Sequence, residues 1–226
     1  MLIQIYQIKD EEKRKAEIER IMNRPPNSRP TVDESLYHRV FKGDLDFNSP
    51  QDILFRINID GHRLFRGEKM GLTDVVEMET AAGKLILLYD SLGMSAVSFN
   101  PEKAQKDENL IRVLIIEPHR IPYESEIENT LEGQQGAVEG LIQYIYNGDG
   151  TIIVANDDGK LIGMEGNRRI QGDVLVGPVF IAGDTGEDLC SLTDEQMAHY
   201  MERFFKPEEI SVKEIQTHCY IRLIPW

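Results

Sequence analysis

Short apolar runs broken by turn residues dominate the first hundred positions of the chain. Residues 2–8 (LIQIYQI) and 35–43 (SLYHRVFKG) are rich in Ile, Tyr, Val and Phe, which is typical of strands. Between them, Asp10 can cap a helix that runs to about Met22. Three prolines within residues 23–31 forbid its continuation. Three residues are expected on the inner face of this helix: Ile18, Ile21 and Met22.

A second helix start lies at residues 49–52. Ser49 is the expected N-cap, Pro50 suits the first helical position, and Asp52 can reach back to the cap. The apolar positions of this helix are Ile53, Leu54 and Ile57. Three further strands are then predicted: DVVEM (74–78), KLILLYD (84–90) and SAVSF (95–99).

The second half opens with an apolar strand, IRVLIIEP (111–118), that Pro118 stops. A helix is predicted from about Glu124 to Val138, because Ile127, Leu131 and Val138 recur at helical spacing. A hairpin follows, since Gly148-Asp149-Gly150 joins two apolar runs.

The remaining pattern predicts two strands and a helix. Asn156 to Gly159 has the composition of a second hairpin turn, and residues 174–184 (VLVGPVFIAGD) are expected to form one strand. A capping box from Thr193 to Gln196 starts an amphipathic helix. The last predicted strand is HCYIRLI (218–224).

These elements predict an α+β protein made of two small mixed domains with mainly antiparallel sheets. Residues 100–109 contain one Pro, two Asn and five charges, so they are expected to form a linker between domains at 1–99 and 110–226. The charge distribution supports two units. Residues 1–106 have a net charge of −1, whereas the rest of the chain carries −13.

Composition and charge narrow the functional classes. A net charge of −14 disfavours direct nucleic-acid binding, which needs an excess of Lys and Arg. No apolar run is long enough to span a membrane, and no signal peptide is recognisable, so we expect a cytoplasmic protein without membrane contact. The two cysteines make no disulfide framework, and the five histidines lack metal-ligand spacing. We therefore expect no metal site.

The sequence contains no recognisable catalytic pattern. A P-loop, a nucleophile elbow and a calcium-binding loop are all absent. No catalytic residue and no cofactor are predicted, so enzymatic activity is unsupported by the sequence and a binding function is favoured.

Glu124, Glu128 and Glu132 form the first candidate surface, because they would follow one face of the expected helix. Such a row can bind a basic protein. Two other readings stay open: a solvated helix face, and imitation of a nucleic-acid backbone.

The second candidate is a small basic cluster in the segment NDDGKLIGMEGNRR (156–169). Lys160, Arg168 and Arg169, with Asn156 and Asn167, can form a site for a carboxylate or phosphate. Adjacent residues of an extended segment point to opposite faces, so only one arginine can face a ligand, and Arg168 is the predicted one. In the alternative reading, the cations only neutralise nearby acids: Asp157, Glu165 and Asp173.

Short motifs in the first half resemble the YodL-like domain family. They are IYQI (5–8), VFKG (40–43), FRIN (55–58), FRG (65–67), LTDVV (72–76) and YDSLG (89–93). Over residues 111–205 the chain resembles a domain of unknown function, DUF3846. The motifs there include VLIIEP (113–118), NTLEGQQGAVEG (129–140), NDDGKLIGMEGNRR (156–169), VGPVFIAGD (176–184) and SLTDEQ (191–196).

Both resemblances imply an accessory protein of a bacterial mobile element. The leading hypothesis is a non-enzymatic protein whose acidic second domain binds a host or element-encoded protein, with an anti-defence role as one form of this. The alternative is a small-anion or nucleotide-binding protein that uses Lys160, Arg168 and Arg169. A hydrolase with an unrecognised site is the third hypothesis.

Overall fold

The computed structural model describes residues 1–25 and 28–219, and the chain forms two compact units, 1–108 and 109–226. Each unit is built on an antiparallel sheet with few helices, so the α+β class predicted from the sequence is confirmed. Across the described ranges, no helix combines the length and apolar character needed to cross a membrane.

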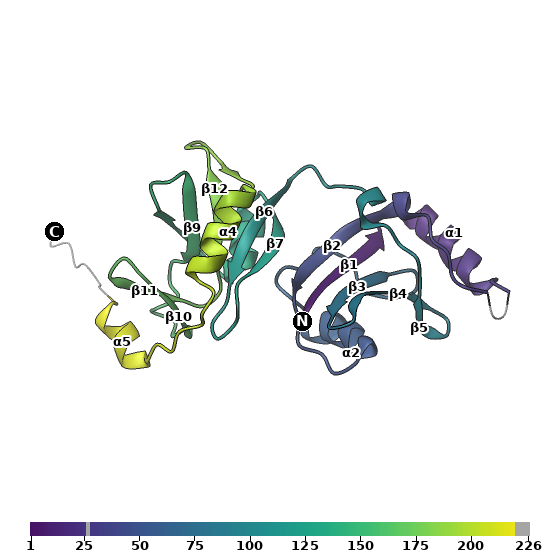
Figure 1. Cartoon of the computed structure of the whole chain (residues 1–226), viewed down its shortest axis with the longest axis horizontal. Helices are drawn as coiled ribbons and strands as arrows, with labels where there is room; N and C mark the ends of the chain where they lie inside the picture. Colours follow the sequence, from purple (N-terminus) through teal and green to yellow (C-terminus); the bar gives the residue numbers. More distant parts are fainter. Residues whose placement is uncertain (26–27, 220–226) are drawn as a thin grey trace. The chain divides into compact units, whose positions relative to one another are not determined.

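The first unit contains a five-stranded antiparallel sheet in the order β2-β1-β3-β4-β5 (Figure 1). Its strands are β1 (Leu2–Ile8), β2 (Tyr37–Asp44), β3 (Val75–Thr80), β4 (Gly83–Asp90) and β5 (Gly93–Ala96). Each coincides with an expected strand to within a few residues. The core is aromatic: the Phe99 ring lies 4.8 Å from that of Tyr6 and 5.4 Å from that of Tyr37.

The helices of the first unit begin where the capping signals place them. Helix α1 (Glu11–Met22) starts at Asp10, whose carboxylate accepts a hydrogen bond from the Lys13 backbone N–H. The expected inner face is partly wrong, because Glu17 and Ile21 are buried whereas Met22 is 61% exposed. Helix α2 (Pro50–Phe55) starts after Ser49 and continues as a π-helical turn, η2 (Arg56–Asp60).

Two details of this unit differ from expectation. The Asp52 carboxylate accepts from the Asn48 backbone N–H, and Ser49 makes no side-chain cap. Residues 100–107, expected in a linker, pack on the first unit. Gln105 N–H donates to Tyr37 O at 2.7 Å, and Asp107 pairs with Lys9. Two 3-10 turns complete the unit: η1 (Glu34–Leu36) and η3 (Pro101–Lys103).

The second unit contains a six-stranded antiparallel sheet in the order β7-β6-β12-β9-β8, with β13 also paired to β12. Its strands are β6 (Leu110–Ile116), β7 (Tyr123–Glu128), β8 (Ile142–Tyr146), β9 (Thr151–Asn156), β12 (Val179–Asp184) and β13 (Leu189–Cys190). Strands β9 and β12 are buried along nearly their whole length, because both faces of the sheet are covered.

Helix α4 (Asp194–Arg203) covers one face (Figure 1). Helix α3 (Leu131–Val138) covers the other. The predicted capping box is confirmed at Thr193 and Gln196, and Met197 and Tyr200 of α4 pack into the core. Tyr144 of β8 identifies the opposite face, because its hydroxyl donates to Gln134 of α3 at 2.6 Å.

A separate hairpin, β10 (Gly166–Ile170) and β11 (Asp173–Val176), packs against the short helix α5 (Val212–Thr217). The single strand expected over 174–184 is wrong. Gly177 adopts a φ of +62° and the following residue is Pro178, so the chain turns there and β11 and β12 enter different sheets.

The predicted helix from Glu124 to Val138 is also wrong in its first half. Residues 123–128 form β7, and the helix begins only after Thr130, whose side chain caps it. Tyr123 and Ile127 fit both a period of two and a period of four. Pairing with β6 decides between them, since it buries Tyr123, Ser125 and Ile127 on one side of the strand.

The turn expected at Asn156–Gly159 exists but closes no hairpin. β9 ends there, and the chain passes through further turns to β10, which pairs with β11 instead. The final predicted strand, 218–224, lies mostly outside the described residues. Of its described positions, His218 caps the end of α5 and Cys219 follows it.

Candidate functional site

Arg168 is the largest fully buried side chain among the described residues of the second unit, with 0% exposure. Its guanidinium donates to four backbone carbonyls: Phe204 O at 3.2 Å, Glu117 O at 3.5 Å, Asn167 O at 3.0 Å and Arg120 O at 2.7 Å. Burial lowers the pKa of this group from its usual value. The prediction that Arg168 faces a ligand is therefore wrong, because its donors are used inside the protein.

The position of the Phe204 carbonyl explains how a buried cation is tolerated. Phe204 is the C-cap of α4, where carbonyl groups lack helical partners and carry partial negative charge. Arg168 supplies donors to this helix end and to the loop at Arg120, and so ties three segments together. Neighbouring Asn167 has the same role, since its amide donates to Ile116 O and Gly177 O.

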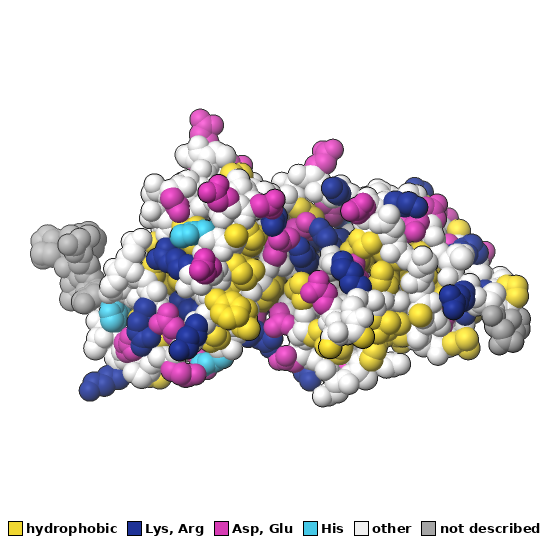
Figure 2. Space-filling view, in the orientation of Figure 1, with side chains coloured by type: hydrophobic (Ala, Val, Ile, Leu, Met, Phe, Trp, Pro, Cys, Tyr) yellow, Lys and Arg dark blue, Asp and Glu magenta, His cyan; other side chains and the backbone are white. Residues whose placement is uncertain are grey.

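Arg169 points the opposite way, to the surface, and forms ion pairs with acidic side chains. Its guanidinium contacts Glu214 at 2.7 Å and Glu208 at 2.6 Å, and these hydrogen bonds raise its pKa. Figure 2 shows basic side chains of the second unit next to acidic ones on the face that it presents.

Lys160 and Asn156 do not join the arginines. Lys160 pairs with Asp173 at 2.6 Å, and the Asn156 amide donates to the carbonyls of Val138 and Glu139 at the end of α3. The five residues predicted as one anion site are thus distributed over separate structural contacts.

A cavity of about 450 Å³ does lie beside Lys160 and Asn156. Its apolar lining includes Ile145, Leu161 and Val174, and its polar lining includes the Lys160–Asp173 pair. It opens next to strand β8, because Gln143 and Ile145 of that strand also line it.

The three acids predicted to follow one helix face are divided between two elements. Glu124 and Glu128 belong to β7 and Glu132 to the first turn of α3. Glu124 is bonded to Arg112 at 2.6 Å, whereas Glu128 and Glu132 are exposed. The helical row therefore does not exist, although two of its members remain surface acids.

The ends of the two larger sheets differ in their protection against further strand pairing. Natural edge strands carry charge, are short, or are covered by another segment. β7 carries three glutamates, β5 has four residues, and β2 is lined by the segment at Gln105. β8 is different, because residues 141–147 (LIQYIYN) contain no charge. Leu141, Tyr144 and Tyr146 are 57%, 40% and 67% exposed.

This surface was missed from the sequence. The uncharged run is visible there, but strand order decides whether an apolar strand is buried or lies at an edge. Only the order β7-β6-β12-β9-β8 places this strand at the end of its sheet.

In the first unit, buried Asp74 organises the segment that follows α2. Its carboxylate accepts from the Gln7 amide at 2.7 Å and from Gly71 N–H at 2.9 Å. The Gln7 side-chain amide also donates to the Glu68 backbone carbonyl and accepts from the Glu68 backbone N–H, both at 3.0 Å. Burial raises the pKa of Asp74 to about 7.

Gly67 belongs to the same arrangement, because a Cβ there would lie 2.2 Å from the Gln7 amide oxygen. This packing gives a physical reason for the motifs FRG (65–67) and LTDVV (72–76). A cavity of about 350 Å³ beside Gln7 is lined by Lys9 and Arg14, but both are paired, with Asp107 and Glu68. The cluster is structural.

Comparison with known families gives two matches. Residues 2–99 match the YodL-like domain family. Residues 111–205 match the domain of unknown function DUF3846. Neither the curated proteins nor the solved structures give a match to the chain.

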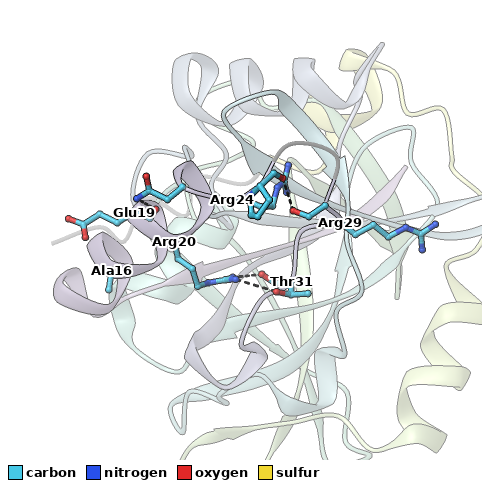
Figure 3. A pocket seen from close by; sticks show the side chains of 9 residues that line it. Ala16, Glu19, Arg20, Arg24, Arg29 and Thr31 are labelled. Atoms are coloured by element: carbon cyan, nitrogen blue, oxygen red, sulfur yellow. Dashed lines mark hydrogen bonds between the residues drawn. The ribbon is translucent and has the colours of Figure 1, made fainter.

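The YodL-like unit has a further cavity, of about 670 Å³, at the end of α1. Three of its lining residues are Arg20, Arg24 and Arg29. Arg20 is held by Glu17 at 2.6 Å and by Thr31, and Arg24 by the buried Asp90 at 3.2 Å. Figure 3 shows Arg29 extending away from Arg20. The arginines do not converge, so the cavity has no centre for an anion.

In the DUF3846 unit, β8 is the edge strand that combines an uncharged sequence with exposed Leu141, Tyr144 and Tyr146. No group of three or more possible metal ligands occurs in the ranges 1–25 and 28–219.

Proposed function

We propose that this protein works by binding, and that its DUF3846 unit takes a positively charged protein segment at the surface around β8. The observation that carries the proposal is an uncharged, exposed apolar strand bordered by acids. Tyr144 and Tyr146 supply large amphipathic contact area, as aromatic residues do at many interfaces.

The bordering acids have no cationic partner among the described residues. Glu139 and Asp157 lie at the start of the strand and Asp149 beyond its end. Burial raises the pKa of the Tyr144 hydroxyl, and the charges of Tyr146 and Asp188 add to this effect. A partner with Lys or Arg beside apolar residues would complement both properties of this surface.

The binding role fits the accessory function that the family resemblance implies, in a bacterial mobile element. That setting rests on the resemblance alone. The small-anion alternative needs free arginine donors, and Arg168 and Arg169 are both occupied within the protein.

The test uses a labelled synthetic peptide, Lys-Arg-Val-Thr-Val-Thr-Val-Arg-Lys, and fluorescence anisotropy with the full chain. Exposed charges are screened within about 8 Å at physiological ionic strength, so affinity should fall as salt rises. The variant Glu139→Lys, Asp157→Lys, Asp188→Lys should abolish measurable binding.

A matched control changes the net charge equally at acids away from β8: Glu128→Lys, Glu132→Lys, Glu202→Lys. This variant should keep most of the affinity, and it also tests the surface predicted from the sequence at Glu128 and Glu132. Equal loss in both variants would show that overall charge, and not the β8 surface, causes binding. No binding by the unchanged protein would refute the proposal.

A further inference from the structure

The geometry points to strand addition as the mode of binding: an extended segment with apolar residues at alternate positions and Lys or Arg at both ends pairs with the outer edge of β8. This inference rests on the proposed function and specifies how the partner is held. It predicts that backbone groups, and not only side chains, make the contact.

The hydrogen-bond alternation along β8 shows which backbone groups are available. Asn147 N–H donates to Thr151 O at one end of the β8–β9 ladder, and Asp157 N–H donates to Leu141 O at the other. In an antiparallel pair, every second residue is bonded to the neighbouring strand. Leu141, Asn147 and the residues in phase with them therefore face β9.

The intervening residues Ile142, Tyr144 and Tyr146 direct their N–H and C=O groups away from the sheet. None of the described residues, 1–25 and 28–219, donates to or accepts from these groups. Three alternate residues of β8 thus each present one N–H donor and one C=O acceptor at its outer edge, which is what an added strand requires.

The two faces of β8 offer different surroundings to the side chains of an added strand. Side chains opposite Tyr144 and Tyr146 would lie on the α3 face, beside the two exposed rings. Side chains opposite Gln143 and Ile145 would lie on the other face, at the 450 Å³ cavity. Alternate residues of the segment thus meet an aromatic surface and a partly apolar recess.

Charge decides the identity of the occupant. A second copy pairing antiparallel about Tyr144 would bring the Asp157 end of one strand to the Asp149 end of the other. Like charges would meet at both ends. A basic-ended segment of another protein instead places Lys or Arg beside Glu139 and Asp157 at one end and Asp149 at the other. The occupant is therefore such a segment.

Residue-resolved amide hydrogen exchange with the full chain and the Lys-Arg-Val-Thr-Val-Thr-Val-Arg-Lys peptide tests the mode. At a peptide concentration tenfold above Kd, about one protein molecule in eleven remains free. Exchange at Ile142, Tyr144 and Tyr146 should then slow by about tenfold. Gln143 and Ile145 already face β9, so their exchange should change far less.

Two substitutions at one exposed position separate backbone from side-chain contact. Tyr146→Pro removes an outward N–H, which an edge strand tolerates, and should weaken peptide binding by about tenfold or more. Tyr146→Val removes the ring but keeps the N–H, and should weaken binding clearly less than Tyr146→Pro does.

The outcomes are distinct. Salt-sensitive binding without alternating protection, or equal loss in the Pro and Val variants, would overturn strand addition and leave the proposed function intact. No binding at all would refute both. Protection of the same amides without peptide, rising with protein concentration, would make a second copy the occupant and overturn the proposal.

Discussion

Arg168 and Arg169 are adjacent residues of one type whose surroundings differ, so they make a matched pair for a stability experiment. Arg168 is 0% exposed and bonded to backbone carbonyls, whereas Arg169 is on the surface and bonded to carboxylates. Replacing each by Met keeps an unbranched, flexible side chain and removes the charge and the donors.

The expected magnitudes follow from these contacts. Arg168→Met removes the donors that the guanidinium supplies to the carbonyls of Phe204, Asn167 and Arg120, and a buried unsatisfied group costs about 1–3 kcal/mol. Part of this loss in stability is offset, because the variant no longer buries a charge. We expect a net loss of about 3 kcal/mol. Arg169→Met breaks exposed ion pairs, which contribute about 0–1 kcal/mol each.

Hydrogen–deuterium exchange of core peptides gives the free energy of opening for each unit in the intact chain. Peptides from β12 report on the second unit, and peptides from β3 are the internal reference. Arg168→Met should accelerate exchange in β12 far more than Arg169→Met, with β3 unchanged. Equal effects, or a loss below about 1 kcal/mol for Arg168→Met, would refute the assigned role of the buried guanidinium.

Three other substitutions have an expected direction of effect on stability. The pKa of Asp74 is raised to about 7, so the folded state binds more protons than the unfolded state between about pH 4 and pH 7, and stability falls as pH rises through that window. Asp74→Asn should remove up to about 4 kcal/mol of this dependence, and parallel pH curves for both proteins would contradict it. Thr193→Ala should cost about 1 kcal/mol through loss of the α4 capping box, measured as a lower Tm of the second unit; an unchanged Tm would refute this contribution. Gly177→Ala should destabilise more than Gly172→Ala in urea titrations, because only at Gly177 does a Cβ approach another atom, Met164 Sδ, at 2.4 Å; equal losses would contradict this.

The elements predicted correctly from the sequence are those with strong local signals. The capping residues Asp10 and Thr193 start α1 and α4, and the Gly148–Gly150 turn joins β8 to β9. Each signal acts over a few residues, so tertiary contacts do not need to be known.

The errors arise where two arrangements satisfy the same local pattern. Tyr123 and Ile127 fit a helix or a strand, and the choice depends on pairing with β6. The run at 174–184 is apolar throughout, but the positive φ of Gly177 divides it between two sheets.

The candidate site illustrates the same limit for charge. The cluster at Lys160, Arg168 and Arg169 is evident in the sequence, but the acceptors of its two arginines are carbonyls and carboxylates from distant segments: Arg120, Phe204 and Glu214. In contrast, β8 looks like an ordinary hairpin strand until the sheet order places it at an edge.

The binding surface is tested most directly by the chemical shifts of the full chain during titration with the Lys-Arg-Val-Thr-Val-Thr-Val-Arg-Lys peptide. Perturbations should concentrate on residues 141–147 and on the bordering acids Glu139, Asp157 and Asp188, and should disappear in the variant with these three acids changed to Lys. Perturbations centred instead on Arg168 and Arg169, or within residues 1–108, would contradict the assignment of the binding surface to β8.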